Sequence, residues 1–442
     1  NNMGKGLHMA PGAPGEYSPL KTFGNIFISF VGAGVLGLPY AFRMAGVLEG
    51  TIIMVLAASV SIKAMLMLVD CKNLIIEQGL HKSGRHKESP SHRSKDGVLP
   101  EVDKELSNLP IDESSLDYGD IGAISYGNKG WWVVQISVVL SQVGFCCAYL
   151  IFIAHNLNTL LPITSNQVIL MSILPLILLA NIRDLSGLAI FSLIANAANI
   201  FAYFVVFYFD FSQVEEHGVA GKAFNFDGVP FFLGVAIYCY EGAGMVISLE
   251  TSLPPEHRKE FPRLFKMALS IITMIYIVFG VCGYISFGSD TEKIITLNMP
   301  DGIFPTIVKA CLCFSLFFTY PMMMFPVSTL IDKLSAGASP THEVSQTKRT
   351  VVRVLLVLCS IVVTLAIPDF AIIMGLIGSS CCMLLALILP GLFHLKLFKG
   401  KLTTLQTVFD LGIVILGIVG SILGMSDAME RIAAHMMETT TE

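Results

Sequence analysis

Eleven apolar segments follow one another along this chain, and most of them are long enough to cross a lipid bilayer as a helix. The segments are continuous, whereas transmembrane β-strands give alternating segments of about ten residues. We therefore expect an all-α integral membrane protein with eleven transmembrane helices. The expected helices span residues 21–46, 49–77, 130–160, 166–181, 185–210, 229–252, 262–287, 303–334, 350–367, 370–397 and 403–425.

The composition agrees with a chain that lies mostly in a bilayer. Hydrophobic residues make up 54% of the 442 residues and charged residues 14%, against about 25% in soluble domains. A soluble protein of this length needs more polar surface than this chain supplies. The net charge is −5, and no basic tail or basic–aromatic stripe is present, which excludes nucleic acid as a partner.

The ten cysteines all lie in or beside the apolar segments, and none forms a pair in a polar loop. The sequence therefore contains neither a disulfide framework nor the ligand spacing of a metal site. It also lacks an intramembrane cluster of His, Asp and Ser of the kind used in catalysis. We expect a protein that is not an enzyme and that holds no metal and no cofactor.

The distribution of Lys and Arg predicts the orientation in the membrane. Most of the 28 Lys and Arg residues fall in connections on the same side as the N-terminus. Because cytosolic loops are enriched in these residues, we expect the N-terminus in the cytosol and the C-terminus outside it. Residues 1–20 then form a flexible cytosolic N-terminus, 79–116 a mobile cytosolic linker and 426–442 an extracytosolic tail. Lys72 is counted with the positive charges of the linker.

The first span contains a cluster of helix-breaking residues near mid-membrane depth. Three glycines and a proline fall in the nine residues from Val31 to Pro39. Glycine weakens a helix, and proline removes a backbone donor. Irregular backbone at this depth is tolerated where it lines a cavity or is buried in protein. Close helix packing through small residues is the alternative interpretation.

The sixth span contains a second cluster at a similar depth. Gly242 and Gly244 follow Glu241 directly within the run from Tyr238 to Gly244. An ionisable side chain inside a membrane helix is costly and usually functional. A glutamate paired locally for structural reasons is the alternative.

The two clusters occupy the first and sixth of the eleven spans. This spacing predicts an inverted five-plus-five repeat, with residues 21–211 and 229–397 as the halves and 403–425 as an eleventh helix. Interrupted helices at matching positions of two halves indicate a transport site. The N-terminal ends of half-helices attract a carboxylate, and free carbonyls attract an ammonium group. An α-amino acid carries both charges and fits two facing breaks.

Three motifs resemble those of the amino acid/auxin permease family. They are residues 32–40 in the first helix, 142–146 with Tyr149 and Asn156 in the third, and 240–242 with 249–250 in the sixth. The resemblance covers roughly 21–425 and is strongest to vacuolar and proton-coupled amino acid transporters. It implies a leucine-transporter-like fold and secondary amino acid transport.

The resemblance also bears on the coupling ion. Sodium-coupled members carry an Asn where this chain has Ile28, which argues against Na⁺. Some proton-coupled members carry His where this chain has Asn25 and Lys63, so neither histidine is present here. Glu241 is then the better candidate for carrying H⁺. Lys63 is a second candidate for proton coupling, through an interior ion pair that changes during the cycle, and snorkelling to the membrane surface is its alternative.

The expected substrate site draws on four helices. The first break supplies backbone groups for the substrate carboxylate, the second surrounds the amino group, and the third and eighth helices flank the site, with three phenylalanines to limit side-chain size. The expected residues are Val31, Gly32, Ala33, Gly34, Val35, Ser141, Phe145, Tyr149, Tyr238, Cys239, Tyr240, Glu241, Gly242, Phe314, Ser315, Phe318 and Thr319.

The expected function is secondary active transport of small neutral amino acids by proton symport with alternating access, in a functional monomer. Two alternatives stay open: an amino-acid-binding sensor or transceptor, and a carrier of auxin or another aromatic acid. The expected location is a vacuolar or lysosomal type of membrane, or the plasma membrane.

Overall fold

The computed structural model describes residues 18–85, 116–181, 189–217, 221–336 and 346–441. All regular elements in these ranges are helices, and the ranges contain no strand. The expected all-α class agrees with this architecture. Residues 86–115, which make up most of the predicted linker, and residues 1–17 of the predicted N-terminus lie outside the described part.

Within the described residues, eight helices are long and apolar enough to cross a membrane, or nine if a bent pair at the start is one span. The predicted spans 166–181 and 185–210 are the two not included in that number. The first corresponds to the short helices α6 and α7, and the second to α8, whose first turn is only partly described. The predicted total of eleven is therefore not confirmed.

The first half of the chain forms a broken helix followed by long helices. Its elements are α1 (Pro19–Phe30), the 3₁₀ turn η1 (Ala33–Gly37), α2 (Leu38–Ala45), α3 (Val47–Arg85), α5 (Tyr118–Leu160), α6 (Ser165–Met171), α7 (Ile173–Ala180) and α8 (Ala189–His217).

The second half also begins with an interrupted helix. Its elements are α9 (Val229–Cys239), α10 (Ala243–Thr251), α11 (Phe261–Phe287), α12 (Ile303–Ala336), α13 (Gln346–Ala366), α14 (Phe370–Ile377), the π-helical segments η7 (Gly378–Cys382) and η8 (Leu384–Ile388), α15 (Leu389–Leu397) and α16 (Thr404–Thr441). Short 3₁₀ turns η3 (Phe226–Gly228), η4 (Pro255–Glu260), η5 (Gly288–Asp290) and η6 (Ile295–Leu297) lie in the connections.

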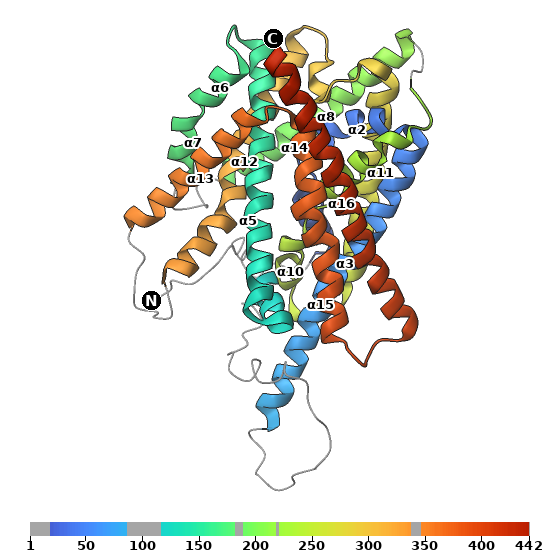
Figure 1. Cartoon of the computed structure of the whole chain (residues 1–442), viewed down its shortest axis with the longest axis vertical. Coiled ribbons are helices and arrows are strands. Elements are labelled where there is room, and N and C mark those ends of the chain that lie inside the picture. Colours follow the sequence, from blue (N-terminus) through green and yellow to red (C-terminus); the bar gives the residue numbers. More distant parts are fainter. Residues whose placement is uncertain (1–17, 86–115, 182–188, 218–220, 337–345, 442) are drawn as a thin grey trace.

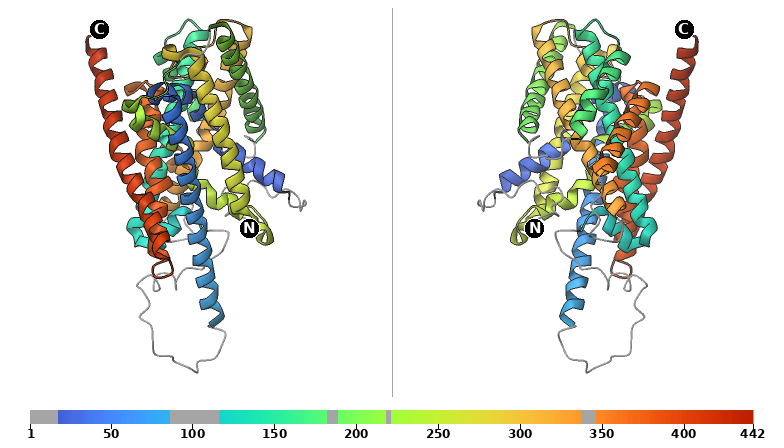
Figure 2. Two further views of the ribbon diagram at one scale, coloured as in Figure 1. Left: turned by 90° about the vertical axis from the view of Figure 1, so that its right-hand side faces the viewer. Right: turned by 90° about the vertical axis from the view of Figure 1, so that its left-hand side faces the viewer.

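The long helices run along one axis and define two ends of the molecule (Figure 1). The end that carries the end of α16 and the connection 288–302 is called the upper end, and the end that carries Arg85 is called the lower end. Helix α5 lies inside the bundle and contacts α12, α13 and α14. Helix α1 packs mainly on α11 and projects from the lower half of the bundle (Figure 2).

Three helix boundaries differ from those expected. Helix α3 continues to Arg85, into the range predicted as linker, and α16 continues to Thr441 through the predicted tail. Helix α5 begins at Tyr118 and is kinked at Tyr126 and Gly127, where the glycine has φ +65°. Polar composition suggested a linker after residue 78 and a tail after residue 425, whereas α3 and α16 extend beyond their apolar segments.

Close contact between glycines fixes α9 against the π-helical part of the tenth span. A Cβ atom on Gly378 would lie 1.9 Å from the carbonyl oxygen of Gly234, so any side chain at position 378 would clash with the backbone of α9. The second interrupted helix is therefore held on one side by α14 and η7.

Candidate functional site

The first helix break lies between α1 and η1. Val31 and Gly32 have extended backbone (φ/ψ −79°/95° and −120°/−173°), and the two helical parts are bent by 50°. A Cβ atom on Gly32 would meet nothing within 4 Å. The break therefore borders open space at the position where the sequence predicted it.

Two tyrosines donate hydrogen bonds to backbone carbonyl groups at this break. The Tyr276 hydroxyl of α11 donates to the Phe30 carbonyl oxygen at 2.7 Å. The Tyr203 hydroxyl of α8 donates to the Gly32 carbonyl oxygen at 3.2 Å. Sequence reasoning missed both residues, because a tyrosine inside an apolar helix carries no signal of its partner.

The second break lies between α9 and α10, at Tyr240, Glu241 and Gly242. The Tyr240 hydroxyl donates to the Thr273 hydroxyl of α11 at 2.9 Å. Helix α11 therefore contacts both breaks, through Thr273 and Tyr276.

The Glu241 carboxylate lies against the backbone N–H groups of Ala243 and Gly244 at the start of α10. Its Oε2 atom is buried without a hydrogen-bond partner. The carboxylate also lies close enough to the Cys381 and Cys382 thiols of η7 to act on them electrostatically. One oxygen of this group is thus free to take a proton or a cationic donor.

The two breaks touch each other. A Cβ atom on Gly34 would lie 3.0 Å from the Cys239 sulfur, and one on Gly242 would lie 2.3 Å from the Phe30 ring. A side chain at position 242 would clash with the Phe30 ring, and one at position 34 would press on the Cys239 sulfur. The structure therefore brings the first and sixth spans together at the residues that the sequence singled out.

Aromatic side chains of α5 and α8 surround the same region. The Phe145 ring packs edge-on against the Tyr238 ring, with 4.7 Å between centroids. Tyr149, which is buried, lies close enough to Tyr203 and Tyr238 for electrostatic interaction. Ser141 is buried too, but its hydroxyl donates to the Val138 carbonyl of its own helix at 2.9 Å.

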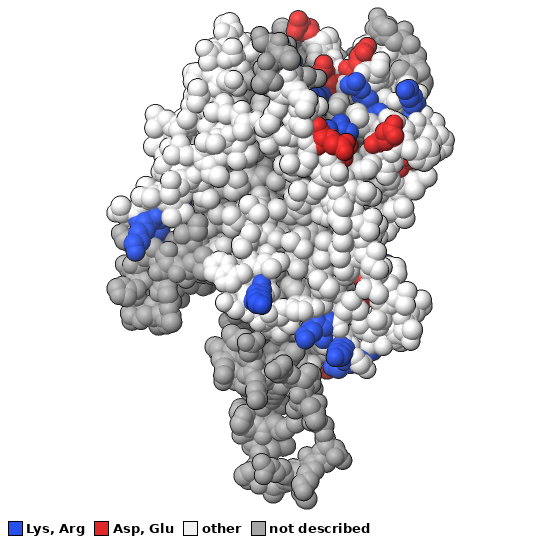
Figure 3. All heavy atoms as spheres, viewed as in Figure 1, with Lys and Arg blue, Asp and Glu red and all other residues white. Residues whose placement is uncertain are grey.

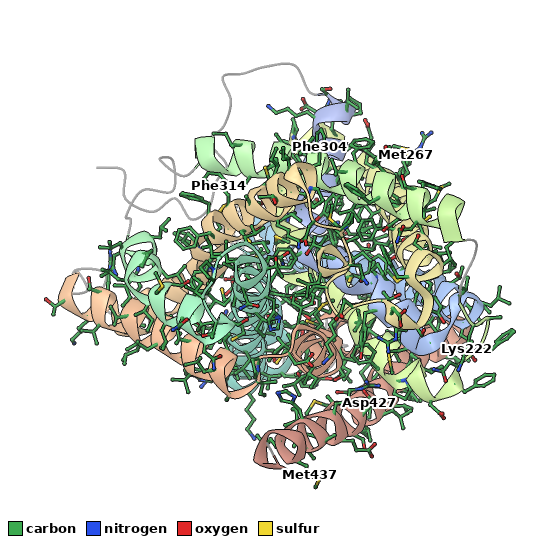
Figure 4. All side chains as sticks on the ribbon, turned by 90° about the horizontal axis from the view of Figure 1, so that it is seen from above. Lys222, Met267, Phe304, Phe314, Asp427 and Met437 are labelled. Atoms are coloured by element: carbon green, nitrogen blue, oxygen red, sulfur yellow. The ribbon has the colours of Figure 1, made fainter. Side chains whose placement is uncertain are left out.

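The predicted residues of α12 divide between two environments. Ser315 is fully buried and its hydroxyl has no hydrogen-bond partner, and the Thr319 hydroxyl donates to the Ser315 carbonyl at 2.8 Å. Phe314 is 38% exposed and lies at the periphery of the bundle (Figure 4), where it packs on Phe318. The structure does not bring Phe314 to the breaks.

Lys63 lies on α3, half-buried, where it interacts electrostatically with Asp70 of the same helix. No ion pair of Lys63 with Glu241 occurs among the described residues. The two residues proposed for proton coupling are therefore not in direct contact in this conformation.

A buried ion pair joins α3 to α10 near the lower end. Lys72 is fully buried and pairs with Glu250, which is 2% exposed, and it donates to the Thr251 hydroxyl at 2.8 Å. Counting Lys72 with the linker was wrong. Charge alone suggested a loop, whereas the partner that allows burial lies 178 residues further along the chain.

The connection 288–299 covers the breaks at the upper end. The Thr296 hydroxyl donates to Asn156 of α5 at 2.6 Å, and Arg43 of α2 donates to the Thr291 carbonyl at 2.8 Å. Ile294 and Ile295 of the connection are buried. Charged residues of both signs gather at this end (Figure 3). The upper side of the site is therefore closed.

The same connection is fastened to the start of α14 by the ion pair of Lys293 with Asp369. Burial lowers the pKa of Lys293, but the hydrogen bond and charge of Asp369 raise it more, so the pKa lies above its ordinary value. A raised lysine pKa stabilises the fold fully below the unfolded pKa of about 10.4, and this is lost as the pH rises through the folded pKa. At neutral pH Lys293 is therefore protonated, and its ion pair with Asp369 contributes fully.

Two cavities also lie at the upper end. One of about 330 Å³ is lined by His155, Lys293, Asp369 and Phe370 among others, and one of about 430 Å³ lies beside Pro300. Neither includes a residue expected to bind substrate. We place the candidate site at the breaks rather than in these cavities, because the free backbone groups lie at the breaks. Within the described residues no cluster of three His, Cys, Asp or Glu side chains fits a metal ion.

The sequence profile of the transmembrane amino acid transporter proteins matches residues 15–88 and 102–430. The chain belongs to the transmembrane amino acid transporter family. This confirms the resemblance to the amino acid/auxin permease family that the motifs of the first, third and sixth helices indicated.

Relatives of this family member cover most of its length. It is 33% identical to the amino acid transporter AVT3C of Arabidopsis thaliana, over 94% of this chain and 91% of the relative. It is 24% identical to the vacuolar amino acid transporter 3 of Schizosaccharomyces pombe, over 87% of this chain and 54% of the relative. These relatives are named as transporters, which agrees with the expectation that the chain is not an enzyme.

A solved structure shares the fold of this family member. The manganese transporter of Eremococcus coleocola superposes with a TM-score of 0.53 at 12% identity, covering 96% of this chain and 91% of that chain. The likeness shows an all-helical membrane transporter fold.

Proposed function

We propose that this chain is a secondary active transporter that moves small neutral amino acids across a membrane by proton symport with alternating access. The observation that carries the proposal is the contact between two helix breaks inside the bundle, in a member of an amino acid transporter family. The breaks offer backbone groups of both polarities at one place. A substrate with a carboxylate and an ammonium group on one carbon matches them.

The carboxylate of the substrate binds at the start of η1. The first N–H groups of a helix have no partner within it, and its N-terminal end is electropositive. Gly32, Ala33 and Gly34 supply these groups, and the open space at Gly32 leaves room for the ligand. Val31 and Val35 border the same backbone.

The ammonium group binds at the end of α9, where the last carbonyl groups of a helix are electronegative. Tyr238, Cys239 and Tyr240 supply this end, with Glu241 and Gly242 beyond it. Phe145 and Tyr149 narrow the space for the side chain, which favours small substrates.

Glu241 carries the proton in this proposal. Its buried Oε2 atom has no hydrogen-bond partner, and burial disfavours the anion, which the N–H groups of Ala243 and Gly244 only partly offset. Protonation from one side and release on the other would then accompany each substrate. Lys63 acts as a secondary charge, through its interaction with Asp70 on α3.

The lower end faces the cytosol in this proposal, because most Lys and Arg residues lie on that side. The upper end then faces a vacuolar or lysosomal lumen, or the outside of the cell. With an acidic lumen, proton symport exports amino acids into the cytosol. Each chain contains both breaks, so a monomer is a complete transport unit.

Uptake of radiolabelled amino acids into proteoliposomes tests the proposal. The panel contains alanine, proline, glutamine, leucine and indole-acetic acid, each with an imposed proton or sodium gradient. We expect uptake of a small neutral amino acid driven by the proton gradient alone. Uptake driven only by sodium, or binding without flux in demonstrably sealed vesicles, would contradict the symport and favour a sensor.

The role of Glu241 is tested by Glu241→Gln, with Glu256→Gln as the matched control on the exposed turn η4. We expect Glu241→Gln to lose proton-driven uptake while exchange of substrate across the membrane persists. The control keeps both activities. Retention of acid-driven uptake in Glu241→Gln would remove Glu241 from the coupling mechanism.

A further inference from the structure

Helices α8 and α11 together hold the first break, through the Tyr203 and Tyr276 hydroxyls. Phe207 of α8 and Phe279 of α11 pack edge-on, with 5.1 Å between ring centroids. Any change in the contact between these two helices therefore reaches the carbonyl groups of the break.

A second feature joins the same helices closer to the upper end. Asp210 lies seven residues beyond Tyr203 on α8, about 10 Å along the helix axis and on the same face. Asp210 is 1% exposed. Its Oδ2 atom is buried and has no hydrogen-bond partner, and no ion pair of Asp210 occurs among the described residues.

The groups on the neighbouring helices do not neutralise this carboxyl group. The Ser286 hydroxyl of α11 lies 2.8 Å from the Asp210 carbonyl oxygen and 2.6 Å from the Cys282 carbonyl oxygen, so its single proton goes to the backbone. The titratable group of α11 beside Asp210 is the Cys282 thiol. On α12, Lys309 donates to Thr159 of α5 instead.

A carboxylate that is buried without a counter-ion or a donor is strongly disfavoured, whereas a protonated carboxyl group is tolerated. The packing of α8 on α11 is therefore the packing of a neutral Asp210. We propose that Asp210 is a proton-binding site, distinct from Glu241, that takes its proton from the upper side and thereby controls the contact between α8 and α11. The inference rests on the proposed proton symport.

Proton binding here is a simple acid–base step. A hydronium ion on the upper side gives its proton to a carboxylate oxygen of Asp210, where an O–H bond forms, and leaves as water. Release returns the proton to water by the reverse step. The charged form favours separation of α8 from α11 and hydration of the carboxylate, and the neutral form favours the close packing seen here. Acid on the upper side thus favours the conformation that is closed at that end.

Uptake measured against pH on the upper side tests the inference. Asparagine mimics the protonated group and cannot titrate. We expect Asp210→Asn to lower the ratio of uptake at pH 5.5 to uptake at pH 7.5 by about threefold or more, mainly by raising uptake at pH 7.5. Asp210→Glu keeps a titrating group and retains a pH-dependent ratio. A ratio equal to that of the wild type in well-folded Asp210→Asn would overturn the inference.

Ser286→Ala and Asp427→Asn are the controls. Ser286→Ala removes the hydroxyl that bonds the Asp210 carbonyl but leaves the carboxyl group, and Asp427 pairs with Arg431 on the part of α16 beyond the predicted span. Both variants keep the wild-type pH ratio if Asp210 acts through its proton. Equal losses of uptake in Asp210→Asn and Ser286→Ala, with an unchanged ratio, would show a purely structural contact and contradict the proposal.

Infrared difference spectroscopy of the full chain in lipid tests Asp210 without relying on transport. We expect a carbonyl stretching band of a protonated carboxyl group that disappears as the pH rises and that is missing in Asp210→Asn. If the wild type shows no proton-driven uptake but shows this band, the symport fails and the proton site stands. Absence of any band that depends on Asp210 would overturn the site whatever the uptake.

Discussion

Two tyrosine hydroxyl groups donate hydrogen bonds to backbone carbonyls at the first helix break. Inside a bilayer no water replaces them at low cost, so each carbonyl needs a donor from a neighbouring helix. Tyr276 and Tyr203 supply those donors from α11 and α8. The break can therefore persist as a defined structure that exposes other backbone groups to a ligand.

We expect Tyr276→Phe and Tyr203→Phe each to lower the free energy of unfolding by about 1 kcal/mol, because each substitution removes a hydrogen-bond donor from a carbonyl of the break. Uptake falls in both variants, since the break loses its defined geometry. Thermal unfolding in detergent and uptake in proteoliposomes measure these effects. Tyr208→Phe is the control, because the Tyr208 side chain is 68% exposed. Unchanged stability in both test variants would contradict the role of the hydroxyls.

At the scale of helices, the two breaks are in direct contact because glycines occupy the positions of closest approach. The residue that allows the contact from the second break is Gly242, whose Cβ would lie 2.3 Å from the Phe30 ring. A Cβ atom on Gly244, two residues further on, would meet nothing within 4 Å. The chain thus contains its own comparison between a glycine needed for packing and one that borders open space.

Gly242→Ala is expected to destabilise the protein by about 1 to 3 kcal/mol, because the added methyl group must displace a buried ring. It should also abolish uptake, since the breaks move apart. Gly244→Ala is expected to leave stability within about 0.5 kcal/mol of the wild type. The comparison uses unfolding temperature, expression level and uptake of both variants. Equal effects would show that the contact with Phe30 is unimportant.

The ion pair between Lys72 and Glu250 ties the lower half of the sixth span to α3. We expect Lys72→Met to cost about 3 to 5 kcal/mol, because it leaves a buried carboxylate without a counter-ion. The double variant Lys72→Met with Glu250→Leu removes both charges and should recover most of that loss. Thermal unfolding of the two single variants and the double variant measures the coupling. Simple addition of the two single losses would contradict it.

The interrupted helices were predictable from sequence, and their partners were not. Glycine clusters around Gly34 and Gly242 identify the breaks, because such residues disfavour a continuous helix wherever they occur. The burial of Lys72 depends on a carboxylate 178 residues away, and Tyr203 and Tyr276 act through hydroxyls that apolar patterning ignores. Local chemistry therefore located the site, whereas long-range pairing within the bundle decides how it is held.

At the scale of the whole molecule, the two ends of the bundle differ. The connection 288–299 is bonded to α2, α5 and α14 and closes the upper side of the breaks. Helix α1 packs mainly on α11 and projects from the lower half, and the backbone at Gly32 borders open space (Figure 2). This asymmetry fits a conformation of the proposed transport cycle that is open toward the lower end.

Reaction of a cysteine at position 244 tests which end is open. Gly244→Cys is placed in a Cys359→Ser background, because Cys359 is the exposed cysteine among the ten. We expect a membrane-impermeant thiol reagent to modify it rapidly from the lower side and slowly from the upper side. Adding Lys293→Gln removes the ion pair to Asp369 and loosens the cover, so modification from the upper side should become faster. Rapid modification from the upper side with Lys293 intact would contradict a closed upper end, and an unchanged rate in Lys293→Gln would show that the other bonds of the connection are sufficient to hold it.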